Sequence, residues 1–154
     1  MKSRLRAFGY WGDTRIENQP KTSFVAPQVW VGAYESEEDR ARVISYLEGG
    51  HVLVGWLGYS HCRFNCGKPD QEMGSHDFTD GTWVWPEGLA HYVRSHGVVL
   101  PCEFLIHMRR LKWIIPEINP EEIERLEDRD DAYAHDFSLC MDDSLGGYNC
   151  EEQN

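Results

Sequence analysis

Helical and strand-like patterns of apolar residues alternate along the chain. The run ESEEDRARVISYLEGG (35–50) has apolar residues three and four positions apart, a capping serine at Ser36 and two glycines at its end, which predicts a helix. HVLVGWLGYS (51–60) is apolar on both alternating faces and predicts a buried strand. FTDGTWVW (78–85) contains an Asp-Gly turn signal followed by alternating residues, which is typical of a hairpin or strand.

Proline and asparagine mark the starts of three further helices. Pro86 suits the first position of a helix that ends at Gly97, and Pro101 similarly opens a helical pattern over 101–114. Asn119 predicts the cap of a helix that starts at Pro120. The fold class that follows is α+β, a small antiparallel sheet with three or four helices. Zinc would stabilise this fold if the candidate ligands discussed below lie close together.

The charge distribution suggests a domain boundary. Residues 117–154 contain 13 acidic residues and 2 arginines, which accounts for the whole formal net charge of −11. We therefore expect one compact domain over 1–130, with its motif core at 60–104, and an acidic tail over 131–154. A segment of this charge repels nucleic acid and attracts a basic protein partner.

Hydropathy and cysteine content predict the compartment. No apolar run approaches the ~18 residues of a membrane span, and no apolar stretch follows the basic first residues as in a secretory signal. The expected location is the cytoplasm, where thiols stay reduced. The five cysteines cannot all pair within one chain, so metal binding or simple burial is the expected use of a close pair.

Two short segments contain the candidate metal ligands. Cys62 and Cys66 lie in SHCRFNCGKP, where Gly67 allows the chain to reverse, and His91 and His96 lie in the helix predicted after Pro86. Zinc prefers thiolate sulfur and imidazole nitrogen in a tetrahedron. The sequence therefore predicts a structural zinc site formed by these four residues. On an ideal helix two residues five apart point about 140° from each other, so the helix must loosen before it ends.

Other interpretations of these residues stay open at this stage. The cysteines can be buried thiols or a Cys62–Cys66 disulfide, and His96 can be a cation near a helix C-terminus. His61 and His76 are substitute ligands if one of the two histidines cannot reach the metal.

A longer motif surrounds the candidate ligands. It reads C-R-x(2,3)-C-G, then G-S-x-x-x-T-D-G-x-W-x-W-P-E-G-L-A-H-Y-V, then H-x-V-x-L-P-x-E-F, and covers Cys62 to Phe104. The chain resembles a group of small bacterial proteins of uncharacterised function that share this string. The resemblance implies no activity.

The motif also contains two tryptophans on one face of the predicted strand. Trp83 and Trp85 are expected in the core, and the alternative is an exposed aromatic platform for a partner.

The function expected from these features is that of a non-enzymatic interaction module. Its acidic end would meet a basic protein, and an immunity or inhibitor-type role is one form of this hypothesis. A zinc-dependent hydrolase is the first alternative, with Asp77, Asp80 or Glu87 as base on a metal-bound water. Two thiolates and two imidazoles would close the metal shell and argue against it.

Two weaker alternatives involve other residues. Cys102 near His107 is a candidate nucleophile, although residues five apart on a helix face away from each other. A zinc-finger-like nucleic-acid binder would have to use the basic residues at 1–6 and 109–112.

Overall fold

The computed structural model describes residues 5–12, 24–127 and 135–141. Its sheet has four strands in the order β1-β4-β3-β2. The strands and helices lie, in chain order, at β1 (Arg6–Ala7), the 3-10 helix η1 (Pro27–Trp30), α1 (Glu37–Glu48), β2 (His51–Gly55), α2 (Asp70–Met73), β3 (His76–Thr79), β4 (Trp83–Pro86), α3 (Leu89–His96), α4 (Cys102–Arg110), α5 (Pro120–Leu126) and α6 (Ser138–Met141). The predicted α+β class is confirmed.

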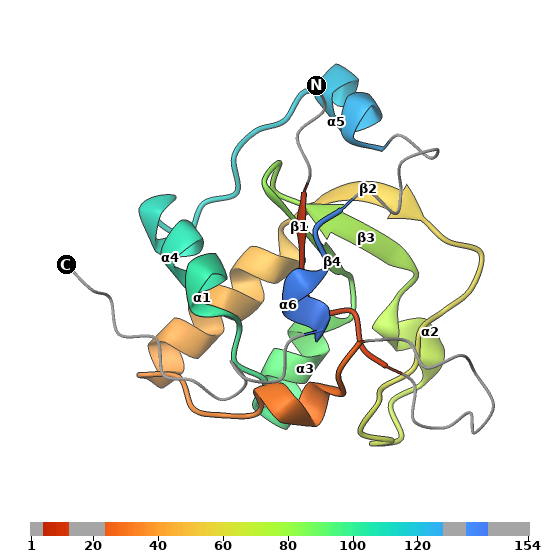
Figure 1. Cartoon of the computed structure of the whole chain (residues 1–154), viewed down its shortest axis with the longest axis vertical. Coiled ribbons are helices and arrows are strands. Elements are labelled where there is room, and N and C mark those ends of the chain that lie inside the picture. Colours follow the sequence, from red (N-terminus) through yellow and green to blue (C-terminus); the bar gives the residue numbers. More distant parts are fainter. Residues whose placement is uncertain (1–4, 13–23, 128–134, 142–154) are drawn as a thin grey trace.

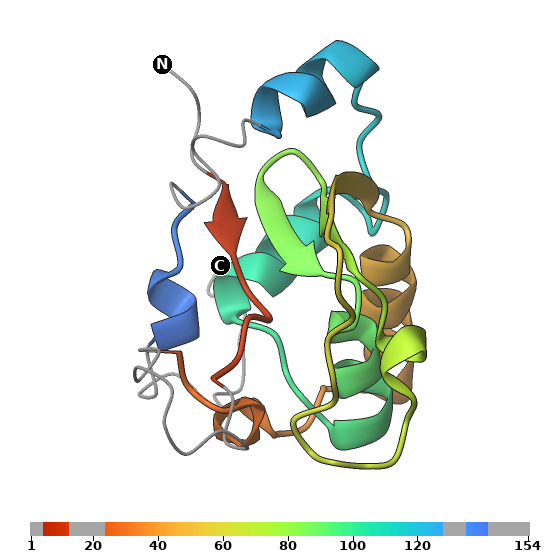
Figure 2. The ribbon, with the colours of Figure 1, turned by 90° about the vertical axis from the view of Figure 1, so that its right-hand side faces the viewer.

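The sheet is mixed, because β1 pairs in parallel with β4. The other two pairings, β2 with β3 and β3 with β4, are antiparallel, as the sequence predicted for the sheet. Helix α1 contacts both α3 and α4. Helix α5 lies next to β2, at the end of the molecule opposite to α3 (Figures 1 and 2). No helix within the described residues is both long and apolar enough to cross a membrane.

The capping predictions explain where the helices begin. Ser36 Oγ accepts a hydrogen bond from the Asp39 N–H at 3.1 Å, and α1 starts directly after Ser36. Asn119 Oδ1 accepts from the Glu122 N–H at 2.8 Å at the start of α5. Each cap satisfies one of the N–H groups that the first helical turn leaves unpaired.

Two local predictions were wrong. Pro86 ends β4 instead of opening α3, because the Glu87 N–H donates to the His76 carbonyl at 2.8 Å and prolongs the pairing with β3. Strand β2 is not buried on both faces, since only Leu53 of its residues is buried and Val52 is 52% exposed. Its position at the edge of the sheet explains this exposure.

Strand β4 contributes to the core on both of its faces. Trp83 and Trp85 are buried in the larger apolar cluster, which confirms the core interpretation of this pair. The Trp83 ring stacks on Phe104 of α4 with ring centroids 4.3 Å apart, and Trp85 Nε1 donates to the Leu47 carbonyl of α1 at 3.1 Å. Val84 points the other way into a second buried cluster.

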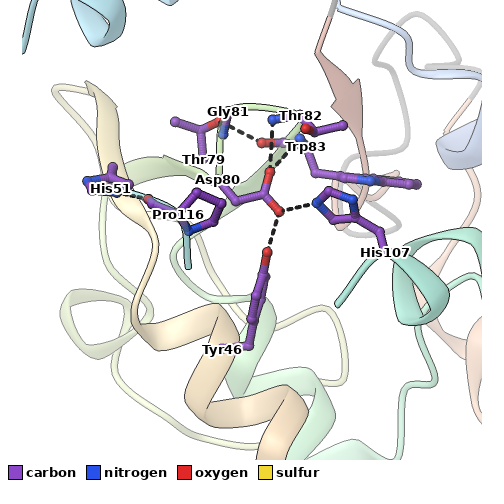
Figure 3. A network of polar contacts seen from close by, with 9 residues as sticks. All are labelled: Tyr46, His51, Thr79, Asp80, Gly81, Thr82, Trp83, His107 and Pro116. Atoms are coloured by element: carbon purple, nitrogen blue, oxygen red, sulfur yellow. Dashed lines mark hydrogen bonds and ion pairs between the residues drawn. The ribbon is translucent and has the colours of Figure 1, made fainter. Parts of the chain in front are cut away.

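A buried carboxylate fixes the β3–β4 turn to two helices (Figure 3). Asp80 Oδ1 accepts from the backbone N–H groups of Thr82 and Trp83 at 2.9 and 2.8 Å. Its Oδ2 accepts from the Tyr46 hydroxyl of α1 at 2.5 Å and lies 2.9 Å from His107 Nε2 of α4. The predicted Asp-Gly turn is therefore also a tertiary anchor.

The predicted tail lies partly within the described residues. Backbone hydrogen bonds join Asp136 to Leu5 and Ala7, and Leu139 and Cys140 of α6 are buried. Residues 135–141 thus pack against β1. The remaining parts of the predicted tail, 131–134 and 142–154, lie outside the described residues, and the boundary at residue 130 stays a prediction.

Gly50 offers a test of how tightly the sheet packs on α1. A Cβ at this position would lie 2.6 Å from Trp85 and 2.9 Å from Phe78 Cβ, so we expect Gly50→Ala to lower the free energy of unfolding by about 1–3 kcal/mol. Gly58→Ala is the matched control, since nothing lies within 4 Å of its Cβ. Urea denaturation measures both variants, and equal midpoints would contradict this packing.

Candidate metal centre

Four predicted ligands meet at one point of the structure. Cys62, Cys66, His91 and His96 each offer one ligand atom, and the four atoms lie within 4.8 Å of one another. We call this group the four-ligand cluster. It is large enough in ligand number, and close enough in space, to hold one metal ion.

Three of the six distances between the ligand atoms are close to those of tetrahedral coordination. Bonds of ~2.3 Å to sulfur and ~2.0–2.1 Å to nitrogen place sulfur and nitrogen about 3.6 Å apart and two nitrogens about 3.3 Å apart. In the structure Cys62 Sγ lies 3.3 Å from His96 Nε2, and Cys66 Sγ lies 3.4 Å from His91 Nε2. The two Nε2 atoms are 3.2 Å apart.

The sheet topology brings the two ligand segments together. Strands β2 and β4 both run antiparallel to β3, so they run in the same direction as each other. The loop that contains both thiols follows β2, and the helix α3 that contains both imidazoles follows β4. Both segments therefore leave the sheet at the same end.

A tight turn orients the two thiols. The Asn65 N–H donates to the Cys62 carbonyl at 3.0 Å, and Asn65 has a left-handed backbone with φ of 52°. Asparagine tolerates this conformation better than most residues, and Gly67 follows with φ of 86°. Three residues can thus separate the cysteines while both sulfurs point to the cluster.

The end of α3 is wider than an ideal α-helix. The Gly97 N–H donates to the Tyr92 carbonyl five residues earlier, where an α-helix would pair it four residues back. The helix thus ends at Gly97 in a turn that is not α-helical, and the two Nε2 atoms lie 3.2 Å apart.

Two aromatic residues that the sequence analysis did not single out hold the ligand segments in place. The Tyr92 hydroxyl accepts from the Arg63 N–H at 2.9 Å and donates to the His61 carbonyl at 3.3 Å, which ties α3 to the loop. The Phe64 ring stacks on His96 with centroids 4.2 Å apart and an interplanar angle of 3°. In the sequence, the only indication of these roles is that both residues lie within the segments that contain the metal ligands.

The protonation state of the two imidazoles favours metal binding. Burial, followed by the charges of His96 and Lys68, lowers the pKa of His91 to about 4, and burial also lowers the pKa of His96. Neutral imidazoles present the lone pair that a metal needs. Burial raises the pKa of the Cys62 thiol, so a metal has to displace its proton. Both cysteines are free thiols, and Cys66 is exposed.

The substitute ligands and candidate bases lie outside the cluster. Neither His61 nor His76 belongs to it, and His76 Nδ1 lies 2.7 Å from Glu87 Oε1. Asp77 accepts from the Tyr10 hydroxyl and the Trp56 indole, both at 2.9 Å. Asp80 and His107 contact each other in the network described above, and the candidate role of Cys102 as a nucleophile stays a prediction.

Comparisons with known proteins add nothing to this picture. No family model matches the chain, and no match was found among curated proteins or solved structures. The resemblance to small bacterial proteins over Cys62 to Phe104 therefore stays a prediction.

The hydroxyl of Tyr92 provides a test of the link between the loop and α3. We expect Tyr92→Phe to lower metal affinity about tenfold, because the Arg63 N–H loses its acceptor and the thiols are held less firmly. Tyr59→Phe is the control, since Tyr59 is 58% exposed. Competition with a chromogenic chelator measures the metal affinity of both variants. An unchanged affinity in Tyr92→Phe would show that the thiol loop does not need this hydrogen bond to bind the metal.

Proposed function

We propose that the protein is a non-enzymatic interaction module whose middle is stabilised by one structural zinc ion. The observation that supports it is the meeting of two sulfur and two nitrogen atoms within 4.8 Å of one another, with three of their distances close to tetrahedral values. Mixed thiolate and imidazole sets suit zinc, whereas magnesium and calcium prefer oxygen. The zinc would join the loop after β2 to the end of α3.

A structural role fits this cluster better than a catalytic one. A catalytic zinc keeps one position open for water, and four protein ligands leave none. The carboxylates considered as bases also have other partners: Asp80 has four donors, Asp77 has two, and Glu87 contacts His76. Both observations favour the structural role over the hydrolase alternative.

An exposed apolar segment supports the interaction role. Trp56, Leu57 and Tyr59 follow β2 and are 53%, 110% and 58% exposed. Neighbouring apolar residues with this exposure are typical of a binding surface. The acidic residues of 117–154 favour a basic protein as partner, and an immunity or inhibitor-type role in the cytoplasm is one form of the proposal.

Nucleic-acid binding receives no comparable support. Arg6 forms an ion pair with Glu103, and its guanidinium lies 4.6 Å from the Trp83 ring centroid. This basic residue is thus engaged within the fold.

Metal content tests the zinc site directly. Elemental analysis of the purified protein is expected to give one zinc per chain, and Cys62→Ser and His91→Ala should each abolish it. Cys102→Ser serves as the control because Cys102 lies outside the four-ligand cluster. Because binding and folding are linked, a chelator should also lower the midpoint of urea denaturation. Zinc retained in both ligand variants would refute the assignment.

Cobalt substitution separates a structural site from a catalytic one. Co²⁺ bound by two thiolates and two imidazoles should give the intense visible absorption of a tetrahedral centre. Added azide should leave that spectrum unchanged, because a closed shell has no exchangeable water. A spectrum that shifts with azide would instead favour the hydrolase.

Salt dependence tests the electrostatic part of the proposal. A partner that meets the acidic segment should lose affinity as salt rises and when residues 142–154 are deleted. The deletion starts at 142 because residues 135–141 pack against the core. Isothermal titration measures both effects, and an affinity unchanged by both would mean that the partner binds elsewhere.

A further inference from the structure

A small pocket lies beside the four-ligand cluster but outside it. Its volume is about 160 Å³, and it is formed where the first described segment meets the loop after β2, α2 and the start of α3. The residues that matter for its chemistry are Trp11, Phe24, Ser60, Arg63, Met73 and Tyr92.

The size and walls of the pocket suit one ring or a compact branched group. Trp11, Phe24, Met73 and Tyr92 line it with aromatic and thioether surface. An apolar cavity of ~150 Å³ holds a molecule of benzene, so a volume of this order selects a group of about that size.

The unused polar groups of the lining are hydrogen-bond donors. Arg63 Nε and Trp11 Nε1 are buried and have no hydrogen-bond partner among the residues that the structure describes. Ser60 Oγ accepts from Arg63 Nη1 at 2.6 Å and keeps its own proton to donate. The Tyr92 hydroxyl, in contrast, already donates to the His61 carbonyl. A ligand that complements this lining must bring acceptors.

The charge of Arg63 makes an anionic acceptor the best match. Among the described residues, none of the ion pairs involves Arg63, which is partly buried. A partly buried guanidinium without a counter-ion is unfavourable, and its planar fork fits a carboxylate with two parallel hydrogen bonds.

The guanidinium is also held in place before any ligand arrives. Arg63 Nη1 donates to Ser60 Oγ and, at 2.7 Å, to the His61 carbonyl, and the Arg63 backbone N–H donates to Tyr92. A group fixed in advance loses little conformational freedom on binding.

We propose that this pocket binds a carboxylate attached to a compact apolar or aromatic group. The apolar group lies against Trp11, Phe24 and Tyr92, and the carboxylate accepts hydrogen bonds from Arg63 and from the Trp11 indole. Two sources offer this chemistry, a free small carboxylic acid and the C-terminal residue of a partner chain with an apolar side chain.

Nuclear magnetic resonance on the full-length ¹⁵N-labelled protein tests the site. The Trp11 indole N–H signal, assigned with Trp11→Phe, is followed during titration with benzoate and with its neutral analogue benzamide. Benzoate should shift this signal in a saturable way, and benzamide should bind at least about tenfold more weakly, because it lacks the charge that Arg63 recognises. Apart from that assignment, this comparison uses the protein without any substitution in the binding site.

A second pair of probes distinguishes the two sources of the ligand. The peptide Gly-Gly-Phe is compared with the same peptide carrying a C-terminal amide. Binding of the free peptide alone identifies a partner's C-terminus, and binding of benzoate alone identifies a small acid. Either result supports the proposal. No shift with either carboxylate at tens of millimolar, or an equal response to the neutral analogues, would overturn it.

Variants connect the response to Arg63. Arg63→Gln should reduce benzoate affinity about tenfold or more, and Arg63→Lys should reduce it less, because it keeps the charge without the fork. Arg110→Gln is the control, since Arg110 is exposed on α4 and does not line the pocket. Dispersion of the amide spectrum confirms that each variant folds. Unchanged affinity in a folded Arg63→Gln protein would also overturn the proposal.

Discussion

The buried carboxylate of Asp80 is the contact on which the arrangement of sheet and helices depends. A carboxylate without solvent is stable only where donors replace water, and Asp80 is met by two backbone N–H groups, Tyr46 and His107. These donors come from the hairpin, from α1 and from α4. If α1 or α4 moved away from the hairpin, this buried charge would lose a partner at considerable energetic cost. Asp80 therefore fixes the positions of the β3–β4 turn, α1 and α4 relative to one another, and the stacking of Trp83 on Phe104 supports the same arrangement.

The position of the hairpin in turn determines where the metal ligands lie. Strand β4 is central in its sheet and leads into α3 after only Glu87 and Gly88, so the hairpin also sets the start of α3. Strand β2 pairs with the other side of β3, and the cysteine loop leaves it at the same end. The four-ligand cluster is thus a consequence of topology as much as of local motif. Two ordinary antiparallel pairings are enough to bring residues 25 positions apart, Cys66 and His91, into contact.

Local signals in the sequence predicted the features that depend on local physics. Ser36 and Asn119 cap helices because a side-chain oxygen three residues before a free N–H satisfies it whatever surrounds it. The four ligands were found because donor chemistry and spacing are visible in the sequence. Pro86 was misplaced because its role depends on a partner strand, and β2 was taken as buried because nothing local shows that a strand lies at an edge. The parallel pairing of β1 rests on two residues, too short a stretch to give a pattern.

The proposed metal site and the pocket are both built from the loop after β2 and from α3, so binding at one would affect the other. Arg63 follows Cys62 directly, and Tyr92 follows His91, so these two pocket residues are each one peptide unit from a proposed metal ligand. The Tyr92 hydroxyl joins the two segments through the Arg63 N–H and the His61 carbonyl. An ion that holds Cys62 to His96 limits the motion of the same loop that positions the Arg63 guanidinium. Metal binding and ligand binding would then favour the same loop conformation, and thermodynamic reciprocity requires that each strengthens the other by an equal factor.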